Sequence, residues 1–390
     1  MGALRSRAAR YPESPVKPAP VYIHAIETAV PAASYDQTYI RDIMKAQPQL
    51  GRRASRIVGG IYNASGIAKR HIAIPDFVPG APAGPFYDPD QQRLLSPNTK
   101  VRNELYTEVA RELFPEVAAR ALAACEGIEA RDVTHVVTVS CTGFYAPGPD
   151  YSVVRALGLS PGVQRLHIGF MGCYAAFPAL RAARAFCEAD PDAVVLVVCA
   201  ELCSLHMRVA DDPDTLIAGS VFADGAGAAI VSAREPAGQA LRIDACATTL
   251  TPVGEADMAW TIGDAGFEMT LSTYVPAIVG EHIGGALAPL LNASEIPVDL
   301  ADVRHWAIHP GGRSILDNVQ TSLGLSDDQL CPSREVLRDY GNMSSATVLF
   351  ILKRLLQLMP GEEGERVCAM AFGPGLTVET ALLTKTQPVN

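Results

Sequence analysis

Basic and aromatic residues are both scarce in this sequence of 390 residues. Lysine and arginine together number 32, against 42 aspartates and glutamates, so the formal net charge is −10. A nucleic-acid ligand is disfavoured, because phosphate contacts require a basic face. Any anionic ligand must therefore meet a local basic patch. With 48% apolar and 19% charged residues, the composition is that of a globular protein with a sizeable core.

The sequence also lacks a long apolar run and a paired set of cysteines. No run reaches the roughly 18 residues that cross a bilayer, and no apolar stretch of a secretory signal follows the N-terminal arginines. The nine cysteines are scattered through apolar runs, which is typical of a reducing, cytoplasmic compartment. Cys199, Cys203 and His206 have partial metal-ligand spacing, but no fourth ligand is near them in sequence. We therefore expect neither a metal site nor a membrane partner.

Short β-branched apolar runs alternate with helical segments along the chain. We expect strands at 21–28, 133–140, 193–200, 303–308 and 367–372. We expect helices at 39–47, 100–124, 173–188, 271–291 and 345–358, a long loop at 76–90 and a flexible arm at 1–20. The alternation predicts an α/β protein built from layers of helix and sheet.

An internal repeat underlies this alternation. One offset in sequence relates three pairs of positions: Ser140 and His309, Cys173 and Asn342, Cys199 and Cys368. Each copy runs from a strand through a small-residue turn, a helix and an acidic loop, at 188–192 or 360–363, to a second strand. Chance similarity between two α/β units is the alternative, but three landmarks at one offset favour a duplication. We place the two halves at 21–235 and 236–390.

Cys173 is the candidate nucleophile. It follows Gly172 and precedes an Ala-rich helical run, which predicts a tight turn into a helix N-terminus. The helix dipole there favours the thiolate, the reactive form of cysteine. The alternative, a small buried hydrophobe, suits Cys187, Cys199, Cys246 and Cys368 better.

His309 and Asn342 are the candidate partners of Cys173. His309 ends a strand and precedes Pro-Gly-Gly, a position suited to hydrogen bonding or base chemistry in a cleft. Asn342 follows Gly341 before a helix, where helix capping is the plain explanation. Its place opposite Cys173 in the repeat favours a functional role, since functional groups collect where two such halves meet.

Four segments together resemble the type III polyketide synthases, the chalcone-synthase-like branch of the thiolase superfamily. They are the turn at Gly172-Cys173, the run His309-Pro310-Gly311-Gly312, the run Gly341-Asn342-Met343-Ser344-Ser345, and the run Gly373-Pro374-Gly375-Leu376. The resemblance extends from about Val21 to Leu383. It implies a five-layered αβαβα thiolase fold made of two duplicated halves. It also implies homodimers that act on coenzyme A thioesters without a carrier protein or a cofactor.

The resemblance also assigns roles within the site. The family's Cys-His-Asn triad falls on Cys173, His309 and Asn342. One gatekeeper phenylalanine falls on Phe222, and Met269 occupies the other gatekeeper position, a departure from the family pattern. The remaining pocket positions are Cys141, Thr142, Cys203, His206, Trp260 and Ser344. Trp260 and His206 stand where plant members carry smaller residues, so we expect less volume on one side of the cavity.

Coenzyme A is anionic, so an acidic protein needs cations at the mouth of its site. Six candidates lie in basic segments: Arg52, Arg53, Arg56, Lys69, Arg70 and Arg313. Of these we favour Arg56, Lys69, Arg70 and Arg313. For each one taken alone, solvated surface charge is the plainer explanation.

The site residues and the resemblance predict an iterative, decarboxylating condensing enzyme. Cys173 takes an acyl group from an acyl-CoA, and His309 and Asn342 stabilise the enolate formed from malonyl-CoA. We expect an aliphatic starter and a short alkylpyrone or resorcinol-type product. The alternatives are an initiating ketoacyl synthase that uses an acyl-carrier protein, and a non-catalytic protein on the same fold.

Overall fold

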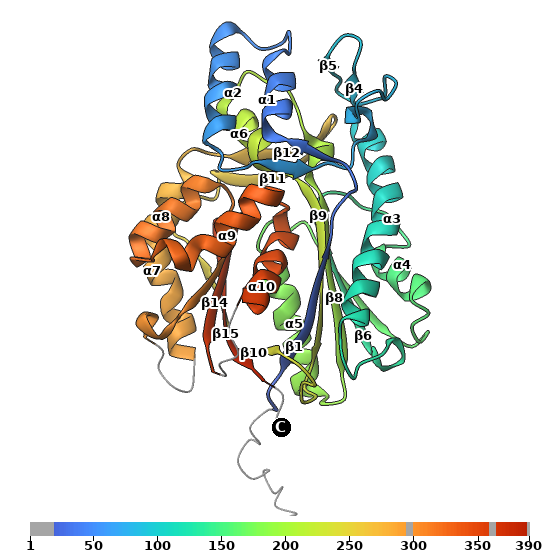
Figure 1. Cartoon of the computed structure of the whole chain (residues 1–390), viewed down its shortest axis with the longest axis vertical. Helices are drawn as coiled ribbons and strands as arrows, with labels where there is room; N and C mark the ends of the chain where they lie inside the picture. The colour runs from blue at the N-terminus through green and yellow to red at the C-terminus, as the bar shows by residue number, and fades with distance from the viewer. Residues whose placement is uncertain (1–18, 294–298, 359–363, 388–390) are drawn as a thin grey trace, which may run out of the picture.

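The computed structural model describes residues 19–293, 299–358 and 364–387. The expected arm at 1–20 lies outside this part of the chain except for its last two residues, and the predicted acidic loop at 360–363 lies outside it entirely. One nine-stranded sheet contains the strands in the order β13-β14-β15-β10-β1-β9-β8-β6-β7 (Figure 1). Helices cover the sheet on its outer faces, so the α/β prediction is confirmed.

The sheet consists of two similar parts. In the first, β6 (His135–Ser140) runs parallel to β8 (Val194–Leu202), and β9 (Asp224–Ser232) and β1 (Tyr22–Ala29) follow antiparallel. The second part repeats these directions.

In the second part, β13 (His305–Ile308) runs parallel to β14 (Arg366–Gly373), and β15 (Thr377–Thr386) and β10 (Ala240–Leu250) follow antiparallel. A short ladder joins the two parts, pairing Tyr22 with Arg242 and Ile23 with Leu241. In the described residues, the edge strand β7 (Gln164–Gly169) has no counterpart in the second part.

Two helices lie between the two parts of the sheet. Helix α5 (Ala176–Ala189) contacts β6, β8 and β9 on one side and β10 and β15 on the other. Helix α10 (Thr347–Leu358) likewise contacts β13 and β14, and also β1 and β9. Outside them, α3 (Thr99–Ala123) and α4 (Pro149–Ala156) cover the first part, and α7 (Val275–Ala293) and α8 (Arg313–Leu323) lie on the side of the second (Figure 1). These are the five layers of the predicted thiolase-like fold.

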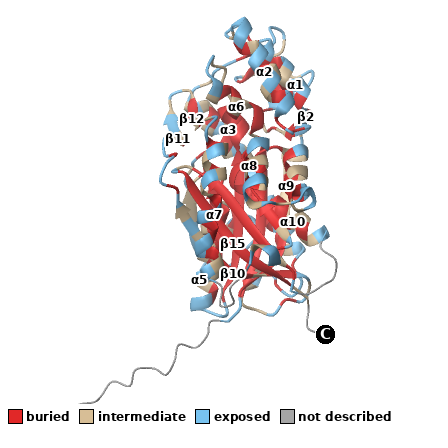
Figure 2. Cartoon of the chain, turned by 90° about the vertical axis from the view of Figure 1, so that its left-hand side faces the viewer, coloured by how far each residue is buried: buried red, intermediate tan, exposed pale blue. Residues whose placement is uncertain are grey.

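Burial explains why the central strands are so apolar. Strand β8 reads VVLVVCAEL and is buried at every position, because helices cover both of its faces. Figure 2 shows similar burial in β15, while α1 (Gln37–Lys45) and α2 (Arg52–Ala64) present exposed faces at one end of the molecule.

Some predicted element boundaries were wrong. The helix expected from 173 begins at Ala176, because residues 172–175 form a turn closed by a 3.1 Å hydrogen bond from the Ala175 amide to the Gly172 carbonyl. The helix expected from 271 begins at Val275, because Leu271 still belongs to strand β12 (Gly266–Leu271). The expected loop at 76–90 also contains β4 (Tyr87–Asp88), which pairs with β5 (Arg93–Leu94).

Candidate active site

Cys173 lies in the turn between β7 and α5, at the boundary between the two halves. Gly172 before it has a φ of +83°, a conformation that favours glycine. A Cβ atom on Gly172 would lie 2.7 Å from Pro374 of the loop between β14 and β15. The second half of the chain therefore packs closely against the turn that holds the thiol, and only glycine fits at position 172.

Asn342 faces Cys173 from the second half. The Cys173 sulfur lies 4.0 Å from Asn342 Oδ1, across 169 positions of sequence. Oδ1 also accepts a 2.8 Å hydrogen bond from the Ser344 amide, and Nδ2 donates to the Gly311 carbonyl at 3.3 Å. The side chain thus helps to cap the short helix at Ser344–Ala346 and also faces the thiol, so the two explanations are compatible.

The backbone of Asn342 is fixed to the candidate gatekeeper Phe222. The Asn342 amide donates to the Val221 carbonyl, and the Ala223 amide donates to the Asn342 carbonyl, both at 2.8 Å. These bonds form a parallel bridge between Phe222 and Asn342. The backbone of the gatekeeper position is therefore bonded directly to that of the triad position.

His309, the remaining member of the predicted triad, directly follows β13. Its amide donates to the Met370 carbonyl at 2.8 Å, and its side chain is fully buried. Neither ring nitrogen has a hydrogen-bond partner among the described residues. Burial lowers the pKa of His309 to about 3, so the ring is neutral at physiological pH. A buried imidazole without a partner is costly unless a ligand supplies one.

A small cavity brings the predicted pocket residues together. It is lined by Cys173 and Asn342 and by all the predicted pocket positions but one: Cys141, Thr142, Cys203, Phe222, Trp260, Met269 and Ser344. Trp260 and Met269 are cross-strand neighbours in the hairpin of β11 (Met258–Gly263) and β12. The free volume is only about 20 Å³, because these large side chains fill the space.

His206 lines an adjoining pocket instead and makes hydrogen bonds through both ring nitrogens. Nδ1 accepts from the Phe267 amide at 2.9 Å, so Nε2 carries the proton and donates to the Thr142 carbonyl at 2.7 Å. Its ring stacks on Phe267, with the ring centroids 4.3 Å apart. Trp260 Nε1 donates to the Cys141 carbonyl at 2.8 Å. Because both of its ring nitrogens are hydrogen-bonded to the backbone, His206 forms part of the wall of the site and is not available as a base.

The expected activation of the Cys173 thiol is not found in this structure. Burial raises the pKa of Cys173 to about 11, and hydrogen bonds with Ser344 and Asn342 only partly offset this. We expected an imidazolium at His309 to lower that pKa, but the same burial keeps His309 neutral. Without a ligand, both groups are therefore neutral, Cys173 as a thiol and His309 as an imidazole.

Among the cysteines of the cavity, Cys173 is expected to be alkylated fastest. Burial raises the pKa of Cys173 to about 11, whereas burial raises those of Cys141 and Cys203 well above the ordinary value. Iodoacetamide labelling read by peptide mass spectrometry should show at least about a tenfold faster rate at Cys173. Below the pKa, the rate should rise about tenfold per pH unit as the thiolate fraction grows. Equal rates at the three cysteines would contradict this assignment.

Glu201 is a site residue that the sequence analysis missed. It lies near the end of β8, is fully buried, and accepts hydrogen bonds from the Cys141 amide at 2.9 Å, the Thr142 hydroxyl at 2.9 Å and the Ser345 hydroxyl at 2.5 Å. It thus ties the end of β6 to the segment after Asn342. A single acidic residue in an otherwise apolar strand was the signal that could have revealed it.

The four cations favoured for coenzyme A are not alike. Arg56 on α2 and Lys69 on β3 (Lys69–His71) are exposed. Arg313, at the start of α8, lines a larger cavity of about 580 Å³. Arg70 was wrongly predicted as a cation of the mouth. It is fully buried, because side chains alternate along β3 and its own points inward.

The larger cavity adjoins the small one. Leu271, Gly311 and Ile315 line both of them. In the part of the chain that the structure describes, no group of three or more potential metal ligands comes together. Nor is any helix there both long enough and apolar enough to cross a membrane.

Comparison with known proteins decides the family. The chalcone and stilbene synthase profiles match residues 19–236 with their N-terminal domain and residues 242–387 with their C-terminal domain. This chain belongs to the chalcone and stilbene synthase family. Members of this family, the type III polyketide synthases, are enzymes of decarboxylating condensation that use acyl-CoA and malonyl-CoA. Neither the non-catalytic alternative nor the carrier-dependent one is supported.

Individual type III polyketide synthases agree with this. Bisdemethoxycurcumin synthase of Oryza sativa subsp. japonica is 35% identical over 308 residues, 76% of each chain. The 3,5-dihydroxyphenylacetyl-CoA synthase of Amycolatopsis balhimycina is 30% identical over 92% of this chain and 91% of its own. The crystal structure of PKS-I from the brown alga Ectocarpus siliculosus superposes with a TM-score of 0.86 at 32% identity, covering 96% of this chain and all of that one.

Proposed function

We propose that this enzyme loads an aliphatic acyl group from an acyl-CoA onto Cys173 and extends it repeatedly with malonyl-CoA. The chain then cyclises to a short alkylpyrone or a resorcinol-type product. The observation that carries the proposal is the approach of the Cys173 thiol to Asn342 across the two halves, at 4.0 Å, together with a buried His309 ring that has no described hydrogen-bond partner. The two relatives carry the names of different products, so the pocket, rather than family membership, must determine the product.

In the loading step, neutral His309 accepts the Cys173 proton. The thiolate then attacks the acyl-CoA carbonyl, a thioester to Cys173 forms, and the proton leaves with the coenzyme A thiol. Because burial lowers the pKa of His309 to about 3, the imidazole is a weak base and its protonated form is a strong acid. The proton therefore returns readily to the leaving group.

In the extension step, His309 and the Asn342 amide donate hydrogen bonds to the thioester oxygen of malonyl-CoA. The oxygen gains charge as carbon dioxide leaves, and preorganised donors in a water-poor site stabilise this enolate. The enolate carbon then attacks the Cys173 thioester and lengthens the chain by two carbons. We propose the cavity of about 580 Å³ as the approach for coenzyme A, with Arg313 on its wall.

The product series from starters of increasing length tests the proposal. Purified enzyme is incubated with malonyl-CoA and straight-chain acyl-CoAs, and the products are identified by mass spectrometry. We expect cyclised products, with one carbon dioxide released from malonyl-CoA for each extension. A linear β-ketoacyl thioester as the sole product, or no release of coenzyme A from any starter, would overturn it.

Trp260 is expected to limit the length of the chain that the cavity accepts. Trp260→Ala removes the indole that stands in the small cavity on β11. We expect kcat/KM for starters one or two carbon pairs longer to rise about tenfold, while the shortest starters gain nothing. Ile262→Ala, on the same strand but exposed, is the matched control and should leave the starter preference unchanged. An unchanged preference in Trp260→Ala would exclude the indole as the limit.

We also propose that the enzyme is a homodimer. Strand β7 is an edge of the sheet, and Leu166 on it and Phe144 nearby are about 40% exposed. An uncovered edge strand with apolar side chains is a common pairing surface. Sedimentation of the purified enzyme at micromolar concentration tests this directly.

A further inference from the structure

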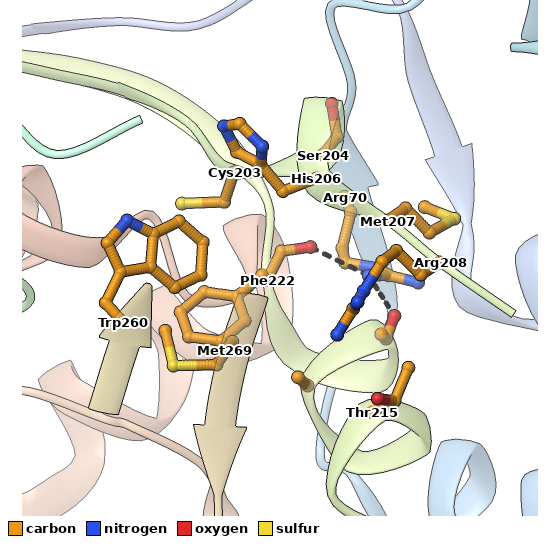
Figure 3. A pocket seen from close by; sticks show the side chains of 12 residues that line it. Arg70, Cys203, Ser204, His206, Met207, Arg208, Thr215, Phe222, Trp260 and Met269 are labelled. Carbon is orange, nitrogen blue, oxygen red and sulfur yellow. Dashed lines mark hydrogen bonds between the residues drawn. The ribbon is translucent and has the colours of Figure 1, made fainter. Parts of the chain in front are cut away.

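A second small pocket lies directly behind the candidate gatekeeper. It shares four wall residues with the Cys173 cavity, namely Cys203, Phe222, Trp260 and Met269. Its free volume is about 30 Å³, enough for one small polar group. Figure 3 shows its apolar wall on one side, with Trp260 and Met269 coming from neighbouring strands, and its arginines on the other.

The far wall of this pocket contains a buried guanidinium. Arg70 is fully buried, and its Nη1 donates to the Phe222 carbonyl at 2.7 Å and to the Gly219 carbonyl at 2.8 Å (Figure 3). Its guanidinium carbon lies 5.6 Å from the centre of the Tyr62 ring. Nε and Nη2 have no hydrogen-bond partner among the described residues. Nη1 is therefore satisfied by carbonyls, whereas the rest of the guanidinium interacts with the neutral Tyr62 side chain and has no anionic acceptor within hydrogen-bond distance among the described residues.

The neighbouring charges do not fill this gap. Asp224 acts on Arg70 electrostatically, but its two oxygens accept hydrogen bonds from the Ala73 amide and from the amide and hydroxyl of Ser204. Arg208, on the wall of the same pocket, is half-buried and pairs with Glu268 at 2.9 Å. No described carboxylate lies within ion-pair distance of Arg70. A buried charge without a direct counter-ion is costly, so a ligand that supplies one is stabilised there.

We propose that this pocket binds a carboxylate at the far end of the starter acyl chain, with Arg70 as its counter-ion. The starter would then be the coenzyme A thioester of a dicarboxylic acid. Its methylenes pass the apolar wall at Phe222, Trp260 and Met269, and its free carboxylate meets the guanidinium. This inference rests on the proposed function and narrows its starter from aliphatic acyl groups in general to those that end in an acid.

The physical basis is the pairing of two groups that are each costly to bury alone. A carboxylate entering the pocket gains a charge-assisted bond, which is about twice as strong as a neutral one. A methyl-ended chain leaves Nε and Nη2 of Arg70 without an anionic acceptor, as they are now. Sites built to bond a polar group discriminate strongly against analogues that lack it.

The test uses pairs of starters with the same carbon number. Succinyl-, glutaryl-, adipyl-, pimeloyl- and suberyl-CoA are each compared with the straight-chain acyl-CoA of equal length, with coenzyme A release and product mass as readouts. We expect one diacid length to exceed its partner in kcat/KM by at least about tenfold. The starter in which the free carboxylate of that diacid is replaced by a neutral amide should have a kcat/KM similar to that of the methyl-ended starter. No preference for any diacid, with methyl-ended starters extended normally, overturns the inference and leaves the proposed function intact.

Variants then tie the preference to Arg70. Because Arg70 also supports Phe222, Arg70→Met is expected to lower activity on every starter. The decisive quantity is therefore the ratio of diacid to methyl-ended kcat/KM, which should fall to about one. A uniform loss that preserves the ratio would show a merely structural role and overturn the assignment. If Arg70→Met does not fold, the comparison of the acid with its amide in the native enzyme still tests the inference. Arg70→Lys, which retains the charge, should keep part of the preference for the diacid.

Discussion

Replacing Cys173 with alanine is expected to abolish polyketide formation while malonyl-CoA is still decarboxylated. The thiol forms the acyl thioester, so without it condensation should fall by at least about four orders of magnitude in kcat/KM. The groups proposed to stabilise the enolate, His309 and Asn342, remain in the variant. Carbon dioxide release measured with labelled malonyl-CoA, together with product mass spectrometry, separates the two activities.

The pH dependence of that residual decarboxylation gives a second measurement on the same variant. Burial lowers the pKa of His309 to about 3, so the neutral imidazole persists as the pH falls. The rate should therefore be nearly constant between about pH 5 and pH 8. A decline of the rate with falling pH, centred near the ordinary histidine pKa of about 6.5, would show that His309 is not desolvated when the thioester is bound.

Controls make either failure interpretable. Cys331→Ala removes an exposed thiol and should leave product formation unchanged. Polyketide formation by Cys173→Ala would mean that another group carries the acyl chain. Loss of decarboxylation as well, in a variant with native circular dichroism, would remove His309 and Asn342 from the proposed enolate site.

The sequence predicted the fold well where each half of the chain repeats the other. Apolar β-branched runs placed β6 and β8 within two residues, since strands buried on both faces need such runs. The common offset of the repeat placed Cys173 opposite Asn342, and their side chains do face each other. That success depends on duplication, because equivalent turns of two halves related in this way meet at their interface.

Properties that depend on contacts between the halves could not be predicted in this way. The pKa of Cys173 follows from how fully the surrounding side chains exclude water, and the local turn alone suggested the opposite direction. Arg70 and Lys69 are equivalent in the sequence, yet one is fully buried and the other exposed. The difference arises from the alternation of a three-residue strand, too short for a sequence pattern to reveal.

Glu201→Ala is expected to cause the largest loss of stability, about 2–4 kcal/mol in the free energy of unfolding, from unsatisfied donors and a cavity. The carboxylate is fully buried and has no described cation beside it, but it accepts bonds from Ser140, Cys141, Thr142 and Ser345. Alanine leaves the Cys141 amide without its acceptor and opens a cavity below the pocket wall. Urea unfolding at pH 7 measures the loss, with Glu104→Ala, exposed on α3, as the control that should change little.

The glutamine variant separates the charge of Glu201 from its shape. Burial raises the pKa of Glu201 above its ordinary value, although its hydrogen bonds, first that from Ser345, oppose the rise. A carboxyl with a raised folded pKa stabilises the fold fully below its unfolded pKa, and that stabilisation is lost as pH rises through the folded pKa. The stability of the native protein relative to Glu201→Gln should therefore decrease as pH increases from about 4 to 7. Identical pH slopes in the two proteins would mean that the folded pKa of Glu201 equals its unfolded pKa, and a relative stability that increases with pH would mean that the four donors lower it.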